Sequence, residues 1–117
     1  MLEFNHMVES SLYNLDTIFH ALSHPSRRAI LQDLQDVKEK TISELAAPFP
    51  VSLAAISKHL QVLQKAGLIK RYKSGSFFYV SLNPEALQTA DEWIQGYKIF
   101  WEAQLDSLKN FLETEEI

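Results

Sequence analysis

Apolar residues recur at helical spacing near the start of the chain. A first amphipathic helix is predicted from Ser11 to about Ser23, because apolar residues there fall at intervals of three and four: Leu12, Leu15, Ile18, Phe19 and Leu22. The pair His24-Pro25 ends this helix, since a residue before proline is disfavoured in the helical region. Pro25 can open a second helix, and the polar stretch 35–40 is then expected to be a loop.

Two further helices are predicted in the middle of the chain. Thr41 and Glu44 have the spacing of a capping box, which predicts a short helix from Ile42 to about Ala47. The segment Pro48-Phe49-Pro50 interrupts it. Ser52 can cap a longer helix that runs to Ala66 and ends at Gly67. The apolar stripe expected to be buried on this helix contains Leu53, Ile56, Leu60 and Leu63.

A β-hairpin and a long helix are predicted after this point. Two β-prone runs, 68–72 and 77–82, are separated by the turn-forming sequence Lys73-Ser74-Gly75-Ser76. Asn83 and Pro84 then open a helix that continues to about Glu113, roughly 45 Å long at 1.5 Å per residue. The expected fold class is mostly α with a small β-hairpin (α+β): a helix-turn-helix at about 41–67, followed by a wing at about 68–82.

Length and composition favour one compact globular unit spanning residues 1–117. The chain is 46% hydrophobic and 22% charged, which are ordinary globular values. No apolar run approaches the roughly 18 residues of a membrane span, and the acidic start does not resemble a secretion signal. We therefore expect a cytoplasmic protein. Because the chain has no cysteine, disulfide frameworks and thiolate metal sites are excluded.

Charge is distributed unevenly along the chain. The formal net charge is −4, yet residues 45–84 contain no Asp or Glu. Five cations lie in this segment: Lys58, Lys65, Lys70, Arg71 and Lys73. Such an asymmetry is expected when one face meets an anionic polymer. Five positive charges in forty residues is an average density, so the unusual feature of this segment is its lack of acidic residues. That lack alone does not decide whether the segment binds an anionic partner.

The order of elements suggests how the chain would bind DNA. An α-helix fits the major groove of B-DNA, while a wing reaches the flanking backbone or minor groove. The outward side of helix 53–66 is small and polar, as base contact requires, although a solvated helix face is the alternative. The candidate DNA-binding residues are Ser52, Ala54, Ala55, Ser57, Lys58, His59, Gln61 and Lys65 on the helix, and Arg71, Lys73, Ser74, Gly75 and Ser76 on the wing.

The stretch ISELAAPFPVSLAAISKHLQVLQKAGLIKRYKSGSFFYVSL closely resembles the ArsR-type winged-helix transcriptional regulators. The resemblance extends upstream through ALSHPSRRAILQDL and covers residues 21–82. It implies a homodimeric DNA-binding regulator, usually a repressor, with Ser57 and His59 at the family's S-x-H positions on the recognition helix.

The chain departs from the family pattern at several positions. Residues 44–48 lack the thiols that many members use to sense metals, and the last helix has Asp91, Glu92 and Asp106 but no histidine. His6, His20, His24 and His59 form no ligand pattern either, so we expect no metal and no cofactor. The chain resembles a cysteine-free subgroup. Gln61 and Ser76 stand where basic residues are common, which predicts weaker phosphate contact. Arg27 and Arg28 could contact phosphates or pair with acidic helices.

The last helix carries more apolar surface than a small body can cover. We expect the first and last helices, about 11–23 and 84–113, to form a dimer seam, although core packing accounts for part of the stripe and a small-molecule pocket is an alternative. The candidate interface residues are Leu12, Leu15, Phe19, Trp93, Tyr97, Phe100, Trp101, Leu105 and Leu108.

These observations predict a sequence-specific, DNA-binding transcriptional regulator, in the manner of a repressor that binds a palindromic promoter site as a homodimer. A winged-helix module used for protein interaction without DNA binding is the alternative. An enzyme is not expected, because Ser57 and His59 do not face each other on a helix and no phosphate-binding or dinucleotide motif is present.

Overall fold

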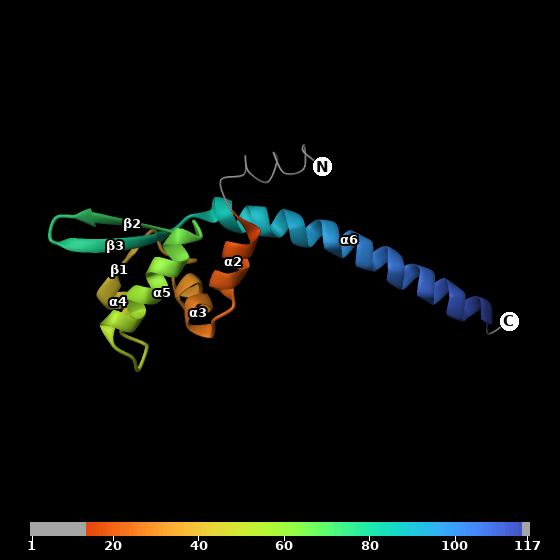
Figure 1. Ribbon diagram of the computed structural model, residues 1–117, viewed down its shortest axis with the longest axis horizontal. Helices are drawn as coiled ribbons and strands as arrows, with labels where there is room; N and C mark the ends of the chain where they lie inside the picture. Colours follow the sequence, from red (N-terminus) through yellow and green to blue (C-terminus); the bar gives the residue numbers. More distant parts are fainter. Residues whose placement is uncertain (1–13, 116–117) are drawn as a thin grey trace.

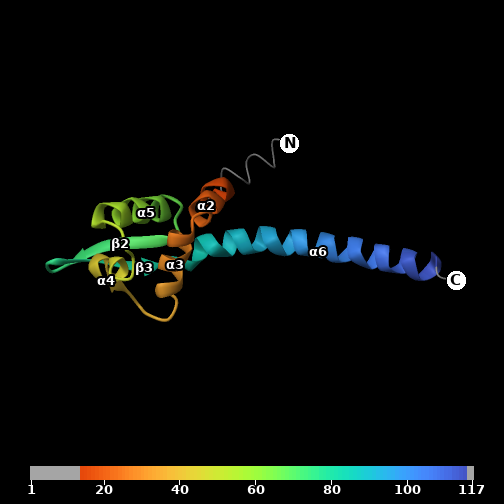
Figure 2. The ribbon, with the colours of Figure 1, turned by 90° about the horizontal axis from the view of Figure 1, so that it is seen from below.

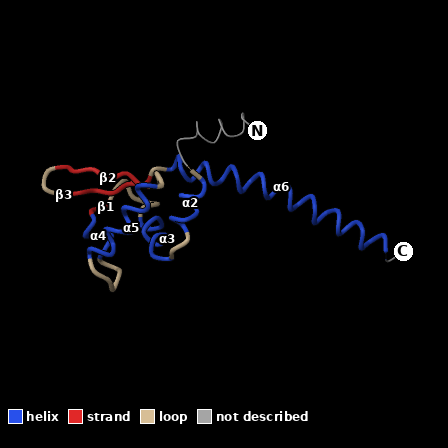
Figure 3. The backbone as a smooth tube through the Cα atoms, viewed as in Figure 1, coloured by secondary structure: helices blue, strands red, loops and turns tan. Residues whose placement is uncertain are grey.

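The computed structural model describes residues 14–115. A small body of short helices and one sheet holds most of the chain, and a single long helix projects from it (Figures 1 and 3). The expected fold class is confirmed. In chain order the elements are α2 (Leu15–Leu22), α3 (Pro25–Asp33), β1 (Lys40–Thr41), α4 (Ile42–Ala46), α5 (Leu53–Lys65), β2 (Ile69–Ser74), β3 (Phe77–Leu82) and α6 (Pro84–Glu115).

Side-chain caps define where the first two described helices begin. Asn14 caps α2, since its side-chain oxygen accepts a hydrogen bond from the Thr17 amide at 3.1 Å. The expected start of this helix at Ser11 lies outside the described residues. His24 caps α3 through its ring, with Nδ1 accepting from the Ser26 amide at 3.1 Å, and Pro25 follows in the first helical position.

The helix-turn-helix consists of α4 and α5. Both halves of the capping box at α4 are present, and the hydrogen bonds from the Thr41 backbone and side chain lower the pKa of the Glu44 carboxyl. Ser52 caps α5 by accepting from the Ala55 amide at 3.1 Å. At the far end Gly67 has φ 78°, a left-handed conformation that glycine adopts without strain.

The wing is an antiparallel hairpin within a three-stranded sheet of order β1-β3-β2. Tyr72 faces Tyr79 across the pair β2 and β3, and the tip turns at Gly75, where φ is 62°. The sequence predicts a loop over residues 35–40. This prediction is wrong at its last residue, because Lys40 lies in β1 and pairs with Val80 of β3. A two-residue strand has no alternating pattern of its own, because only the neighbouring edge of β3 defines it.

The core lies between α2, α3, α5 and the sheet. Ile18, Ile30, Leu34, Leu60 and Val80 are among its fully buried side chains. The sequence prediction fails for Leu53, which is 57% exposed. This residue lies in the first turn of α5, beyond the edge of the core, and lines a shallow hollow together with the wing residues Phe77 and Phe78.

Only the start of α6 packs on the body. Asn83 is buried before it, and its side-chain amide donates to the Gly67 carbonyl at 2.7 Å. Ala86 and Ala90 are also buried, whereas every residue from 91 to 114 is exposed. Figure 2 shows α6 projecting away from the body. The radius of gyration is 19.6 Å, against about 13 Å for a compact domain of this size. No helix among the described residues is long and apolar enough to cross a membrane.

Candidate DNA-binding site

The candidate recognition surface is the side of α5 that faces away from the core. Ile56, Leu60 and Leu63 hold the opposite side in the body. Most of the proposed contact residues are accessible. Ser52, Ala54, Lys58, Gln61 and Lys65 are exposed, while Ala55, Ser57 and His59 are partly buried.

The partial burial of His59 comes from a contact with the start of α3. Its Nδ1 lies 3.2 Å from Nη1 of Arg27, and its ring centroid lies 4.5 Å from that of His24. Burial, followed by the effects of His24 and Arg27, lowers the pKa of the His59 imidazole. His59 is therefore neutral at pH 7, and one of its two ring nitrogens is already engaged.

Arg27 lies in the body and is not available to a phosphate. Only 8% of its surface is exposed, and its guanidinium donates from Nε to the Ala21 carbonyl at 2.7 Å and from Nη2 to the His20 carbonyl at 3.1 Å. Arg28 donates from Nη1 to the Leu22 carbonyl at 2.7 Å. The two arginines thus satisfy the last carbonyls of α2, where the helix dipole favours positive charge. The two roles that the sequence left open for Arg27, phosphate contact and ion pairing with an acidic helix, are therefore both wrong, because this side chain binds backbone carbonyls instead.

The cations around α5 and the wing are not neutralised by carboxylates. Within residues 14–115 the sole ion pair joins Lys98 and Glu102 on α6. Lys58 and Lys65 on α5, and Arg71 and Lys73 on β2, therefore have no acidic partner in the described part of the chain. A surface of this kind attracts a polyanion.

The wing carries aromatic side chains that sequence analysis did not include among the site residues. Phe77 and Phe78 are exposed beside the exposed tip residues Ser74, Gly75 and Ser76. The Lys73 ammonium lies 5.7 Å from the centroid of the Phe78 ring. The sequence could have indicated this feature. Two consecutive phenylalanines follow the glycine turn, and adjacent residues of a strand point to opposite faces, so at least one of the two must face away from the core.

The candidate dimer seam is an aromatic stripe on α6. Trp93 stacks on Tyr97 with centroids 5.4 Å apart, and Tyr97 contacts Phe100 and Trp101. From α2, Phe19 meets Trp93 edge-on at 5.7 Å. Of the other residues expected there, Leu105 and Leu108 are exposed, Leu15 packs against the core of its own chain, and Leu12 lies outside the described residues.

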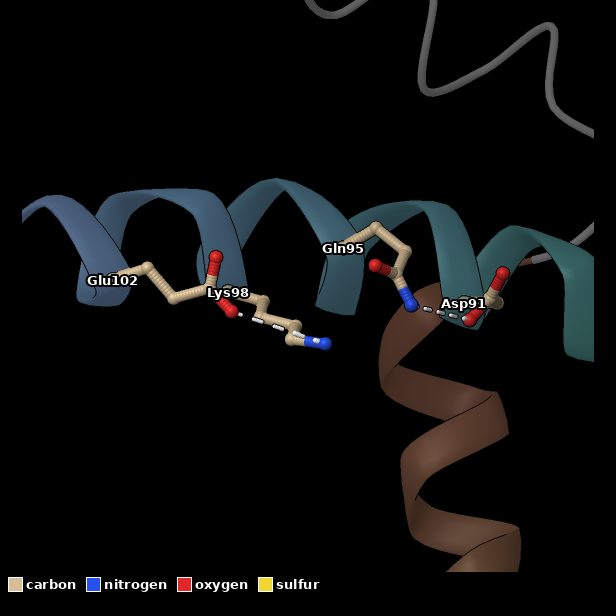
Figure 4. A network of polar contacts seen from close by, with 4 residues as sticks. All are labelled: Asp91, Gln95, Lys98 and Glu102. Atoms are coloured by element: carbon tan, nitrogen blue, oxygen red, sulfur yellow. Dashed lines mark hydrogen bonds and ion pairs between the residues drawn. The ribbon is translucent and has the colours of Figure 1, made fainter.

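A polar face of α6 carries Asp91, Gln95, Lys98 and Glu102 (Figure 4). The Gln95 amide donates to Asp91 at 3.3 Å, and Lys98 pairs with Glu102 at 3.9 Å, each across one helical turn. Both partners of the Lys98 pair are 61% exposed, so the pair adds little stability. Among residues 14–115 no group of three or more histidine or acidic side chains could hold a metal ion.

Comparison with known proteins places this architecture in a family. A helix-turn-helix domain model matches residues 22–72. The chain is 36% identical over 83 residues to transcriptional repressor SdpR of Bacillus subtilis (strain 168), covering 71% of this chain and 91% of that protein.

Two solved structures agree. A crystal structure of an ArsR family transcriptional regulator superposes with a TM-score of 0.70 at 34% identity, over 75% of this chain and 90% of the other. An ArsR-like transcriptional regulator from Rhodococcus sp. RHA1 superposes with a TM-score of 0.72 at 31% identity, over 86% and 91% of the two chains. These likenesses confirm the resemblance seen in the sequence: the chain belongs to the ArsR family of winged helix-turn-helix transcriptional regulators, which are DNA-binding proteins and not enzymes.

Proposed function

We propose that this regulator acts as a repressor, binding a palindromic promoter site as a homodimer and presenting α5 to the major groove. The observation that carries the proposal is the outward face of α5, which is small, polar and basic, and which no carboxylate of the described residues neutralises. Bulky side chains there would hold the helix away from the bases. The name of the related repressor of Bacillus subtilis supports the direction of the effect.

The contacts divide by chemistry. Ser57, His59 and Gln61 can hydrogen bond to base edges, and the two small residues Ala54 and Ala55 can meet thymine methyl groups. Lys58 and Lys65 suit phosphates, and Ser52 lies at the helix N-terminus. The wing supplies the flanking contacts, from Arg71, Lys73, Ser74, Gly75 and Ser76.

A second copy of the chain is the proposed partner of α6. Its aromatic stripe is largely exposed, although Phe19 of the same chain contacts Trp93, and a twofold axis would let the same stripe cover itself. Two recognition helices enter successive major grooves when they are about 34 to 36 Å apart, so the seam sets the half-site spacing. The seam would also allow a signal to change DNA affinity without touching DNA.

Selection from a randomised duplex library, followed by gel shift of the selected site, tests DNA recognition. We expect a twofold-symmetric site and a loss of discrimination in Ser57→Ala of about 1 to 3 kcal/mol per base contact. The variant Lys58→Ala should weaken binding to all sequences and reduce the log-log salt slope by about 0.9.

Lys38→Ala is the matched control for Lys58→Ala. Lys38 is exposed in the loop between α3 and β1. Figure 2 shows this loop on the side of the body opposite α5, so removal of the Lys38 charge should leave the salt slope unchanged. Binding that is indifferent to both sequence and salt would contradict DNA recognition and favour the protein-interaction alternative.

A further inference from the structure

Arg27 joins three parts of the body through one guanidinium. Two of its nitrogens donate to the Ala21 and His20 carbonyls at the end of α2, and a third, Nη1, lies 3.2 Å from Nδ1 of His59 on α5. No carboxylate within the described residues pairs with it. The guanidinium is therefore held on two sides by carbonyls, with its remaining edge directed at the recognition helix.

The chemistry of this contact determines the protonation of the His59 ring. An arginine side chain has donors and no acceptor, so Nδ1 of His59 must accept. A neutral imidazole that accepts at one nitrogen carries its proton on the other, which is Nε2. Within residues 14–115, Nε2 of His59 makes no hydrogen bond.

The surroundings of the ring favour the same form. The titratable and charged groups that act on it are His24 and Arg27, and no acidic group contributes. The Nδ1 of His24 accepts from the Ser26 amide, so both neighbouring histidines use Nδ1 as an acceptor. Burial and the nearby positive charge lower the pKa of His59, which keeps the ring neutral at pH 7.

We propose that Arg27 is a positioning residue that fixes His59 as a neutral hydrogen-bond donor through Nε2, so that His59 selects a base that offers an acceptor in the major groove. The proposal rests on the proposed function, because it assumes that α5 faces DNA. The acceptors available are purine N7, guanine O6 and thymine O4, whereas the amino groups of adenine and cytosine would be rejected. Since the ring is neutral, His59 contributes no counterion release.

Nitrogen NMR of the histidine rings tests the donor form without DNA. In protein labelled with ¹⁵N-histidine at pH 7, we expect His59, assigned by loss of its signals in His59→Gln, to be neutral and protonated at Nε2. In Arg27→Gln its tautomer balance should shift toward Nδ1–H and its titration midpoint should rise. A protonated ring, an Nδ1–H ring in the wild type, or no change in a folded Arg27→Gln would overturn the proposal. If Arg27→Gln does not fold, Arg27→Met, which keeps an unbranched stem but has neither charge nor donor, replaces it under the same criteria.

Modified bases test the acceptor in the selected site. Substitution by 7-deazaguanine or 7-deazaadenine removes N7, 2-aminopurine lacks the O6 of guanine, and 5-methyl-2-pyrimidinone lacks the O4 of thymine. At one position in each half-site the wild type should lose about tenfold in affinity, while His59→Ala should be insensitive there. No sensitive position, or equal sensitivity in His59→Ala, would overturn the proposal.

The salt dependence of DNA binding distinguishes a neutral His59 that contacts a base from a cationic His59 that contacts a phosphate. Removal of His59 should leave the log-log salt slope unchanged, and a decrease of about 0.9 would identify a cationic phosphate contact and overturn the proposal. His20→Ala is the control for loss of an exposed imidazole, because Arg27 uses only the backbone carbonyl of that residue. If the selection finds no DNA site, the proposed function fails while the NMR result still decides the state of His59.

Discussion

The winged-helix body and the distal part of α6 differ in how their apolar side chains are covered. In the body, Ile18, Leu34, Leu60 and Val80 are fully buried by neighbours from other elements of the same chain. In α6, from residue 91 to 114, no side chain is buried, although tryptophan, tyrosine, phenylalanine and leucine repeat along one side. Residues of the same chemical kind thus stabilise the fold of the chain in one region and remain exposed to solvent in the other.

The largest expected effect distinguishes the two sides of α5. Leu60→Ala removes a fully buried side chain and should lower the free energy of unfolding by about 2 to 5 kcal/mol, measured by urea denaturation at fixed protein concentration. Leu53→Ala on the same helix is the control, because that side chain is 57% exposed and its loss should cost less than about 1 kcal/mol. Equal losses would contradict the assignment of the core.

The next effect concerns association and not folding. Trp101→Ala should weaken the dimer by about 2 kcal/mol, roughly thirtyfold in its dissociation constant, measured by sedimentation equilibrium. Ile99→Ala is the control, since Ile99 is 69% exposed and lies nearly opposite Trp101 on α6. A Trp101→Ala monomer that still binds a full palindrome tightly would refute the seam.

A smaller effect is expected at the first turn of α5. Ser52→Ala removes the acceptor for the Ala55 amide and should destabilise the protein by about 1 kcal/mol in the same urea experiment. Ser52→Thr keeps a hydroxyl acceptor and should retain most of the stability. Similar losses in the two variants would show that the cap bond is not the cause.

The smallest expected effect is a dependence of stability on pH. The pKa of His59 is lower in the folded protein than its ordinary value of 6.5, so the unfolded chain binds more protons in the interval between the two values. Stability should therefore be complete above about pH 6.5 and decrease as the pH falls toward the folded pKa. Urea unfolding at a series of pH values should show a shallower dependence in His59→Gln than in the wild type. An equal or steeper dependence in the variant would contradict the lowered pKa.

Local signals predicted most of the helices because each depends on residues close in sequence. The Thr41 and Glu44 capping box, the Ser52 cap and the Gly67 terminus involve groups within a few positions, and their chemistry can be identified without knowing the rest of the fold. The family pattern across residues 21–82 added the order of these elements.

The errors occurred where a side chain's environment depends on distant residues. Leu53 fits the apolar spacing of α5, but the edge of the core falls one turn further on. Arg27 was a candidate phosphate contact by charge alone, whereas the end of α2 supplies two carbonyls that bury it. Lys40 joined a sheet only because β3 lies beside it.

Sequence alone determined the caps of α4 and α5, the helix periods, the acid-free segment 45–84 and the excess of apolar surface on α6, since these are properties of neighbouring residues along the chain. Tertiary structure alone decided which cations lack an acidic partner within the described residues and which side chain contacts the His59 ring. The contact between Arg27 and His59 spans 32 positions, and it exists because packing of α2, α3 and α5 brings a buried donor to a ring nitrogen. No local pattern encodes such a contact, because it forms only when the helices meet.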